Sequence, residues 1–136
     1  MAQNEALSQK YPNAFRWSFG DSAAMANELA ALVVAGKKRA TCGSLASFEQ
    51  ETVRPWPGCY HIVLNGEQQP VCVIRTRAMQ LIRFDDVTAE LAQLEGEGDL
   101  SLRYWQQEHR AFFEREGTFS PDMELVFEHF ILIETL

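Results

Sequence analysis

A lysine and a threonine three residues apart could support nucleophilic catalysis. The stretch GKKRATCGSL places Lys38 three residues before Thr41, with Lys37 and Arg39 on either side of the lysine. A neutral lysine amine can act as general base toward a threonine hydroxyl, and neighbouring positive charge favours the neutral amine. The pattern predicts Lys38 as base and Thr41 as nucleophile, with Lys37 and Arg39 lowering the pKa of Lys38. The alternative is a basic run that only complements the end of the preceding helix.

The acidic loop, residues 95–99 with the sequence EGEGD, is a second candidate. Glu95 or Glu97 could orient the base or exchange a proton with a leaving group. Two other interpretations stay open. The loop could be a solvated entry to the next helix, or its carboxylates could hold a divalent cation, although their number and spacing match no recognised metal loop.

A third candidate is the helix predicted after the acidic loop. Its apolar face would carry Leu102, Trp105, His109, Phe112 and Phe113. A histidine on such a face is more often structural than functional, and the same holds for His61 and His129. Aromatic residues could stack on a nucleobase if they lined a cleft: Trp17, Phe19, Trp56, Tyr60, Tyr104 and Trp105. Arg75 and Arg77 could contact phosphates or form a solvated sheet face.

Charge and cysteine content narrow the classes of function. The net charge of -7 argues against extended DNA binding, because such binding depends on basic residues that displace counterions from phosphates. No apolar run is long enough to span a membrane, and the polar N-terminus lacks a signal-peptide core, so we expect a cytoplasmic protein. Cys42, Cys59 and Cys72 form no zinc motif or disulfide framework; Cys72 is expected to be buried, and Cys42 could be reactive if nearby cations lower its pKa.

The predicted elements indicate an α+β fold. We expect a short helix before Pro12, an aromatic connector, a helix from Asp21 or Ser22 to about residue 35 that ends at Gly36, and an extended segment over 39–45. After a polar loop over 46–57, two strands form a hairpin through NGEQQ. Helices then cover about 85–94 and 99–116, the second capped by Asp99, before a last strand from about 123. This order favours a small mixed β-barrel or strongly curved sheet with flanking helices over a βαβ arrangement.

Several of these stretches together resemble the ASCH domain family of the PUA-like superfamily, especially its small stand-alone bacterial members. The matching segments are FGDS, ANELAALVVAGKKRAT, PVCVI and FDDVTAELAQLEGEGDLSLRYWQQEH. The resemblance implies a single domain over residues 1–136, with 1–16 as a peripheral N-terminal arm. It also implies a PUA-like β-barrel with a cleft whose wall includes the Gly-x-Lys-x-x-Thr turn.

Some relatives of this kind are amidohydrolases that deacetylate N4-acetylcytidine with a threonine nucleophile, a lysine base and a glutamate. Carried over by motif, these roles fall on Lys38, Thr41, and either Glu95 or Glu97. Backbone N–H groups at 42–44 could stabilise an oxyanion. The residues expected to bind substrate are Lys37, Arg39, Ser44, Trp105 and His109.

The resemblance leaves two alternatives, an RNA-binding module and a metal-dependent ribonuclease. The expected partner is a small nucleoside or a short single-stranded RNA, with no membrane partner. No cofactor or metal is expected, except a divalent metal under the ribonuclease alternative. The chain is longer than the compact amidohydrolases, which leaves the substrate open.

Overall fold

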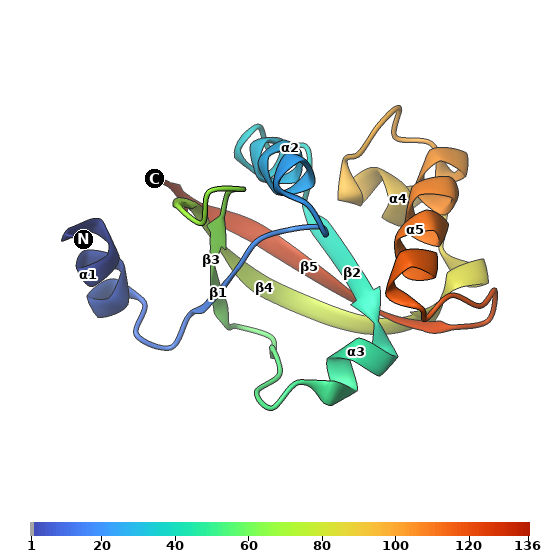
Figure 1. Cartoon of the computed structure of the whole chain (residues 1–136), viewed down its shortest axis with the longest axis horizontal. Helices are drawn as coiled ribbons and strands as arrows, with labels where there is room; N and C mark the ends of the chain where they lie inside the picture. The colour runs from blue at the N-terminus through green and yellow to red at the C-terminus, as the bar shows by residue number, and fades with distance from the viewer. Residues whose placement is uncertain (1) are drawn as a thin grey trace.

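The computed structural model describes residues 2–136, with side chains from Glu5 onward, and shows a five-stranded, curled half-barrel sheet surrounded by helices (Figure 1). The helices are α1 (Ala2–Lys10), α2 (Ala23–Val34), α3 (Leu45–Gln50), α4 (Ala89–Glu95) and α5 (Leu102–Glu116), with a 3-10 turn over Phe84–Asp86. The strands are β1 (Phe15–Trp17), β2 (Ala40–Ser44), β3 (Tyr60–Leu64), β4 (Pro70–Arg83) and β5 (Glu124–Thr135). The predicted α+β class and PUA-like fold are confirmed.

The sheet has the order β1-β3-β4-β5-β2, in which β1 pairs with β3 in parallel and all other pairs are antiparallel. β4 and β5 are its two long strands. Their pairing shifts register between Val73 and Ile74 and again between Thr76 and Ala78. Such irregularities bend a strand and increase its twist. β4 and β5 can therefore take part in both ends of the curled sheet.

Two predicted features of the chain differ from the structure. Residues 46–57 were expected to form a loop, but α3 occupies the first part of this segment, because the Ser44 hydroxyl accepts a hydrogen bond from Ser47 N at 3.1 Å and caps the helix. The prolines that argued for a loop lie beyond α3. The other difference is the cap of α5, which is Ser101 and not Asp99. Asp99 instead accepts a hydrogen bond from the backbone N–H of Ser101.

The core has two main parts. One lies between α4, α5 and strands β2 and β5, and is built around Trp105, Phe113 and Phe127. The other lies between α2 and strands β3 and β4 and contains Cys72, which is fully buried as predicted. In Figure 1, β2 runs between α2 and the pair α4–α5. The gap between the two cores is therefore bordered by three helices and the edge strand.

The N-terminal segment packs on the outside of the sheet. Leu7 of α1 and Tyr11 are buried against Ile62, Leu64 and Val73 of β3 and β4. Among the described residues, no helix has both the length and the apolar character needed to cross a membrane.

Candidate functional site

The basic turn, residues 36–39, is held against the end of α4 by backbone contacts. Gly36 ends α2 with a φ of +78°, and Arg39 N donates a hydrogen bond of 2.7 Å to Leu94 O. Gly96 closes α4 with a φ of +71°, and a Cβ atom on it would lie 2.2 Å from Lys37 O. A side chain at position 96 would therefore separate the two segments. This close approach brings Lys38 beside both glutamates of the acidic loop.

Lys38 points inward from this turn and is 2% exposed. Its Nζ donates to Glu95 Oε1 at 3.0 Å and to Glu97 Oε2 at 2.9 Å. A third contact, to the backbone oxygen of Glu95, measures 3.3 Å. The three donors of the ammonium group are thus each matched to an acceptor. A buried ammonium without such partners would be costly.

Glu95 is the centre of the cluster and is 1% exposed. One carboxylate oxygen, Oε1, accepts from Lys38. The other, Oε2, accepts a short hydrogen bond from Trp105 Nε1 and lies 3.3 Å from Cys42 Sγ and 3.2 Å from His109 Nε2. Both oxygens are therefore fully engaged within the protein. Glu97, by contrast, has a side chain that is 16% exposed.

The ionisation of the cluster differs from the prediction for Lys38. Burial by itself would lower the pKa of Lys38, but the negative charges of Glu95 and Glu97 outweigh it and raise that pKa. Burial likewise opposes ionisation of Glu95, yet Lys38 and His109 hold its pKa below the usual value. The expectation of a neutral lysine was wrong, because the local charges at Lys38 are the two carboxylates.

Two neighbours of Glu95 respond to the same carboxylate. Burial disfavours the charged form of His109, but Glu95 compensates and the pKa of His109 is raised. Burial and then the charge of Glu95 raise the pKa of the Cys42 thiol well above its ordinary value. The expectation that Cys42 could be a reactive thiol with a lowered pKa is therefore wrong for this state of the site.

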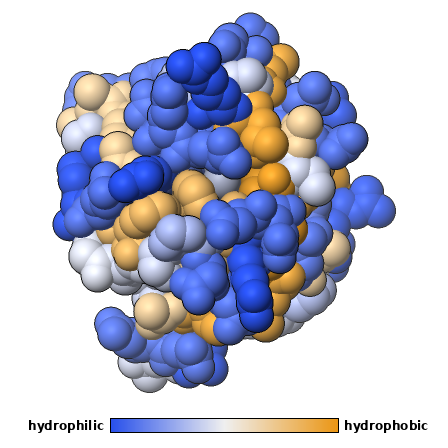
Figure 2. All heavy atoms as spheres, turned by 90° about the vertical axis from the view of Figure 1, so that its right-hand side faces the viewer, coloured by the Kyte–Doolittle hydropathy of each residue, from blue (hydrophilic) through white to orange (hydrophobic). Residues whose placement is uncertain are grey.

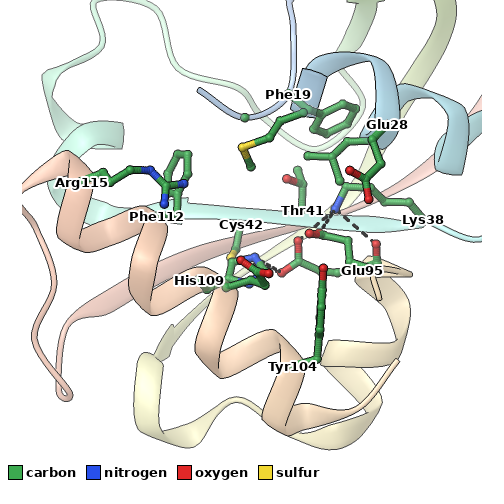
Figure 3. Close-up of a pocket in the computed structure, with 15 residues that line it drawn as sticks. Phe19, Glu28, Lys38, Thr41, Cys42, Glu95, Tyr104, His109, Phe112 and Arg115 are labelled. Atoms are coloured by element: carbon green, nitrogen blue, oxygen red, sulfur yellow. Dashed lines mark hydrogen bonds and ion pairs between the residues drawn. The ribbon is translucent and has the colours of Figure 1, made fainter. Parts of the chain in front are cut away.

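These groups line one pocket of about 210 Å³, which we call the Lys38 pocket (Figure 3). Thr41 and Cys42 of β2 contribute to its wall, together with Phe19 and residues of α2 and α5. Within the described residues, the Thr41 hydroxyl forms no hydrogen bond with another protein group, whereas Lys38 is saturated with carboxylates. The structure thus brings Lys38, Thr41, Glu95, Glu97 and His109 together around one cavity, but without a Lys38–Thr41 hydrogen bond.

Three residues expected to bind substrate lie elsewhere. Lys37 and Arg39 are exposed and face a different cavity, on the far side of the basic turn. Successive side chains of the turn point in opposite directions, so Lys38 points to the interior and Lys37 and Arg39 point away from it. Ser44 is 2% exposed and outside the Lys38 pocket, where its hydroxyl caps α3 and donates to Glu116 Oε1 at 2.9 Å.

The aromatic residues divide between two places. Phe19 and Tyr104 line the Lys38 pocket, whereas Trp56 and Tyr60 line a separate cavity of about 300 Å³ near α1. Trp105 does not line the pocket; it is buried beneath His109, with ring centroids 4.2 Å apart. Its position therefore does not offer a free ring face to a ligand.

The other residues considered as candidates lie away from the Lys38 pocket. Arg75 lies over the Tyr60 ring and donates to Gly58 O, and Arg77 is exposed. His129 contacts Gln80 at 2.9 Å. His61 is buried between Trp17 and Thr76. None of these four residues lines the Lys38 pocket.

Sequence reasoning missed three charged residues of the pocket wall. Glu28 comes from α2, whereas Glu108 and Arg115 come from α5. Arg115 also pairs with Asp21 at 2.9 Å. In a sequence, single charged residues on helices are hard to distinguish from residues of a solvated face. For α5, the spacing of Tyr104, Glu108 and Arg115 by four and seven residues was the signal that these three residues share a face.

The pocket is more acidic than basic. Four glutamates line it, Glu28, Glu95, Glu97 and Glu108, against the cations Lys38 and Arg115 and the histidine His109. Figure 2 shows the α4–α5 end of the molecule, where hydrophilic residues dominate and hydrophobic ones appear in narrow patches.

One group of pocket residues has the composition of a metal site. Cys42 Sγ, a carboxylate oxygen of Glu95 and a ring nitrogen of His109 all lie within 4.8 Å of one another. No sequence pattern indicates this group, because its members are separated by 53 and 14 residues along the chain.

Comparisons with known proteins agree with this architecture. The chain superposes on the crystal structure of a protein from Enterococcus faecalis with a TM-score of 0.87 and 36% identity, covering 99% of this chain and 91% of that one. An ASCH domain from Lactobacillus crispatus gives a TM-score of 0.82 and 36% identity, covering 93% of this chain and 84% of that one. A mutant ASCH protein from Zymomonas mobilis shares the fold, with a TM-score of 0.58, 11% identity and coverage of 89% and 71%.

The comparison with curated proteins found no match. The family model of the ASCH domain, however, matches residues 15–134, which include the whole Lys38 pocket and all of the sheet except the last residue of β5. The two relatives at 36% identity cover nearly the full chain. The chain therefore belongs to the ASCH domain family.

Proposed function

We propose that the protein is a hydrolase that cleaves an amide bond of a small molecule, with N4-acetylcytidine as the first substrate to test. The observation that carries the proposal is the Lys38 pocket itself. It combines a threonine hydroxyl that has no hydrogen-bond partner in the described part of the chain with a buried lysine held between two carboxylates. These residue types match the motif of the amidohydrolases that the sequence resembles.

The charges assign the roles differently from the sequence motif alone. Because Lys38 is protonated, it cannot accept the proton of Thr41 in this state. Glu97 is the better proton acceptor, since it uses one oxygen for Lys38 and is partly open to the pocket, whereas both oxygens of Glu95 are engaged. The positive charge of Lys38, whose three hydrogens are donated to Glu95 and Glu97, would then act through space on the negative charge that develops on the amide oxygen.

The proposed reaction has two balanced steps. Thr41 Oγ1 attacks the acyl carbon and loses its proton to Glu97, and that proton passes to the departing amine, leaving the acyl group on Thr41. A water molecule then attacks the ester, releases the carboxylic acid and restores the Thr41 hydroxyl. This scheme needs only water as co-reactant.

The acidic pocket wall favours this proposal over RNA binding or ribonuclease activity. A phosphate chain entering the pocket would meet the carboxylates of Glu28, Glu97 and Glu108. A neutral nucleoside or similar amide would not suffer this repulsion.

The test measures release of cytidine from N4-acetylcytidine by the wild type and by Thr41→Ala, Lys38→Met and Glu97→Gln. We expect each substitution to lower the rate at least 100-fold, and Lys37→Ala, a matched exposed control next to Lys38, to leave it unchanged. Turnover that survives both Thr41→Ala and Glu97→Gln would overturn the assignment. Cleavage of single-stranded RNA with no deacetylation would support the ribonuclease alternative.

A further inference from the structure

We propose that Cys42, Glu95 and His109 form a binding site for zinc, or a divalent cation of similar softness, at the floor of the Lys38 pocket. The three side chains come from β2, the end of α4 and α5, and all three line the pocket. In Figure 3 they meet below Thr41, on the side of Glu95 opposite Lys38. This inference is independent of the hydrolase proposal.

The distances fit a tetrahedral zinc site. With usual zinc–ligand bond lengths, neighbouring ligand atoms in a tetrahedron lie about 3.3 to 3.6 Å apart. Glu95 Oε2 lies 3.3 Å from Cys42 Sγ and 3.2 Å from His109 Nε2. The three ligand atoms are within 4.8 Å of one another. Two of the three ligand pairs therefore already have nearly tetrahedral spacing, and the third pair, Cys42 with His109, is no more than 4.8 Å apart.

The ring of His109 is already oriented as a metal ligand. Its Nδ1 lies 2.9 Å from the backbone oxygen of Trp105, and the ring stacks on the Trp105 indole. A histidine that donates through Nδ1 to a backbone carbonyl presents the lone pair of Nε2 to a metal. Glu95 is fixed in a similar way, because Lys38 holds Oε1 and Trp105 Nε1 donates to Oε2, the oxygen that also faces Cys42 and His109.

A cation at this position would meet groups that already face one another. In the metal-free state the Cys42 thiol and the His109 ring both face Glu95 Oε2. Zinc binds thiolate and neutral imidazole, so the Cys42 proton leaves when the metal enters. The carboxylates of Glu95 and Glu97 and the Cys42 thiolate then carry three negative charges, which balance the divalent cation and the Lys38 ammonium. The nearby Lys38 therefore does not exclude the cation.

The ligand types select the cation. Thiolate and imidazole ligands favour zinc and similar transition metals over magnesium or calcium, which prefer oxygen. Three protein ligands also leave one tetrahedral position free. That position would open into the Lys38 pocket, where water or an added anion could occupy it.

Cobalt(II) provides the test, because a cobalt–thiolate bond gives a charge-transfer band in the near ultraviolet. We expect the metal-free wild type to develop this band and to saturate at one equivalent of Co²⁺, and excess Zn²⁺ to abolish it. Cys42→Ala should remove the band, and His109→Ala should weaken Co²⁺ binding at least tenfold. Added thiocyanate should change the spectrum if the fourth position is open to the pocket.

Cys59→Ala is the matched control. Cys59 is also a buried thiol beside a histidine, with Sγ 3.3 Å from His61 Nε2, but no carboxylate of the described residues completes that group. This variant should bind Co²⁺ as the wild type does. Circular dichroism confirms that each variant is folded before titration.

Absence of a saturable band in the wild type, or a band unchanged by Cys42→Ala, would overturn the proposal. The outcome does not depend on the hydrolase, because the readout is spectroscopic and no substrate is present. Conversely, the Thr41→Ala variant should lose deacetylation but keep the Co²⁺ spectrum of the wild type.

Discussion

The molecule contains two clusters in which a tryptophan, a histidine and a cysteine meet, and they behave in opposite ways. In the first, Trp17 Nε1 donates to His61 Nδ1 at 2.8 Å, while His61 Nε2 faces Thr76 and Cys59. In the second, Trp105 donates to Glu95, and His109 and Cys42 contact the same carboxylate. The residue types are the same except for one carboxylate in place of one hydroxyl.

That single difference changes which protonation state of the histidine is favoured. Burial lowers the pKa of His61 to about 4, so it is neutral at physiological pH. The pKa of His109 is raised, because the attraction of Glu95 exceeds the effect of burial. Because Trp17 can only donate, it fixes His61 with its proton on Nε2, and His61 cannot take a proton from Cys59 there. A buried carboxylate and access to a pocket, rather than the triad of residue types, distinguish the candidate site.

Glu95→Gln should give the largest effect, since it removes the feature that separates the two clusters. Lys38 would lose one of its two charged partners while remaining buried. Breaking a buried ion pair in this way destabilises a protein by about 3 to 5 kcal/mol. Urea denaturation at pH 7 measures this loss. A change below 1 kcal/mol would show that Glu95 does not hold the cluster together.

The same variant has a defined pH dependence. The pKa of Glu95 is lowered in the folded state, so its stabilising effect is present at neutral pH and declines as the pH falls below the ordinary value of 4.5. The difference between Glu95→Gln and the wild type should therefore shrink on acidification. An NMR titration should also show the pKa of His109 falling below 6.5 in the variant, while that of His61 stays at about 4.

Glu128 tests the opposite case, a half-buried carboxylate that forms no ion pair among the described residues. Its Oε1 has no hydrogen-bond partner among the described side chains, and burial, followed by the charge of Glu51, raises its pKa to about 7. A raised carboxylate pKa gives stability that is complete below pH 4.5 and is lost as the pH rises through 7. Glu128→Gln should therefore stabilise the protein by about 2 kcal/mol at pH 8 and have little effect at pH 4.5. Thermal unfolding at both pH values checks this, and equal effects at the two would contradict it.

The two tryptophans should differ by a smaller amount. Trp105→Phe removes a hydrogen bond to a charged acceptor, which contributes about 2 kcal/mol, whereas Trp17→Phe removes one to a neutral imidazole, which contributes about 1 kcal/mol. Chemical denaturation of both variants under one set of conditions gives the comparison. The interpretation fails if Trp17→Phe is the more damaging of the two.

Arg115→Ala should have the smallest effect on stability. Its ion pair with Asp21 is exposed, with side chains 52% and 39% accessible, and such pairs contribute little in water. We expect no measurable change in Tm. Because Arg115 lines the pocket, KM for a bound substrate is the quantity to measure, and a large drop in Tm would show that the pair has a structural role.

The sequence was sufficient to predict most of the helices and strands and several residues that line the pocket. Hydrophobic periodicity identified α2, α5, β4 and β5, and the motif brought Lys38, Thr41 and the acidic loop together. The β1 strand was missed because three residues that pair in parallel with β3 leave no periodic pattern.

The electrostatics could not be predicted, because they depend on which way each side chain of the basic turn points. Lys37 and Arg39 are adjacent to Lys38 in sequence, but Glu95 and Glu97 are adjacent to it in space. The same reason hid the group of Cys42, Glu95 and His109. Its members meet only after β2, α4 and α5 have packed.

The hydrogen bond from Arg39 N to Leu94 O links the formation of the pocket to a contact between distant parts of the chain. It joins two segments more than fifty residues apart in sequence, and the contact at Gly96 rests on the same junction. Until this junction closes, Lys38 has neither carboxylate beside it. The pocket thus depends on this long-range junction, and hydrogen exchange at the Arg39 amide would report how often the junction opens in the native protein.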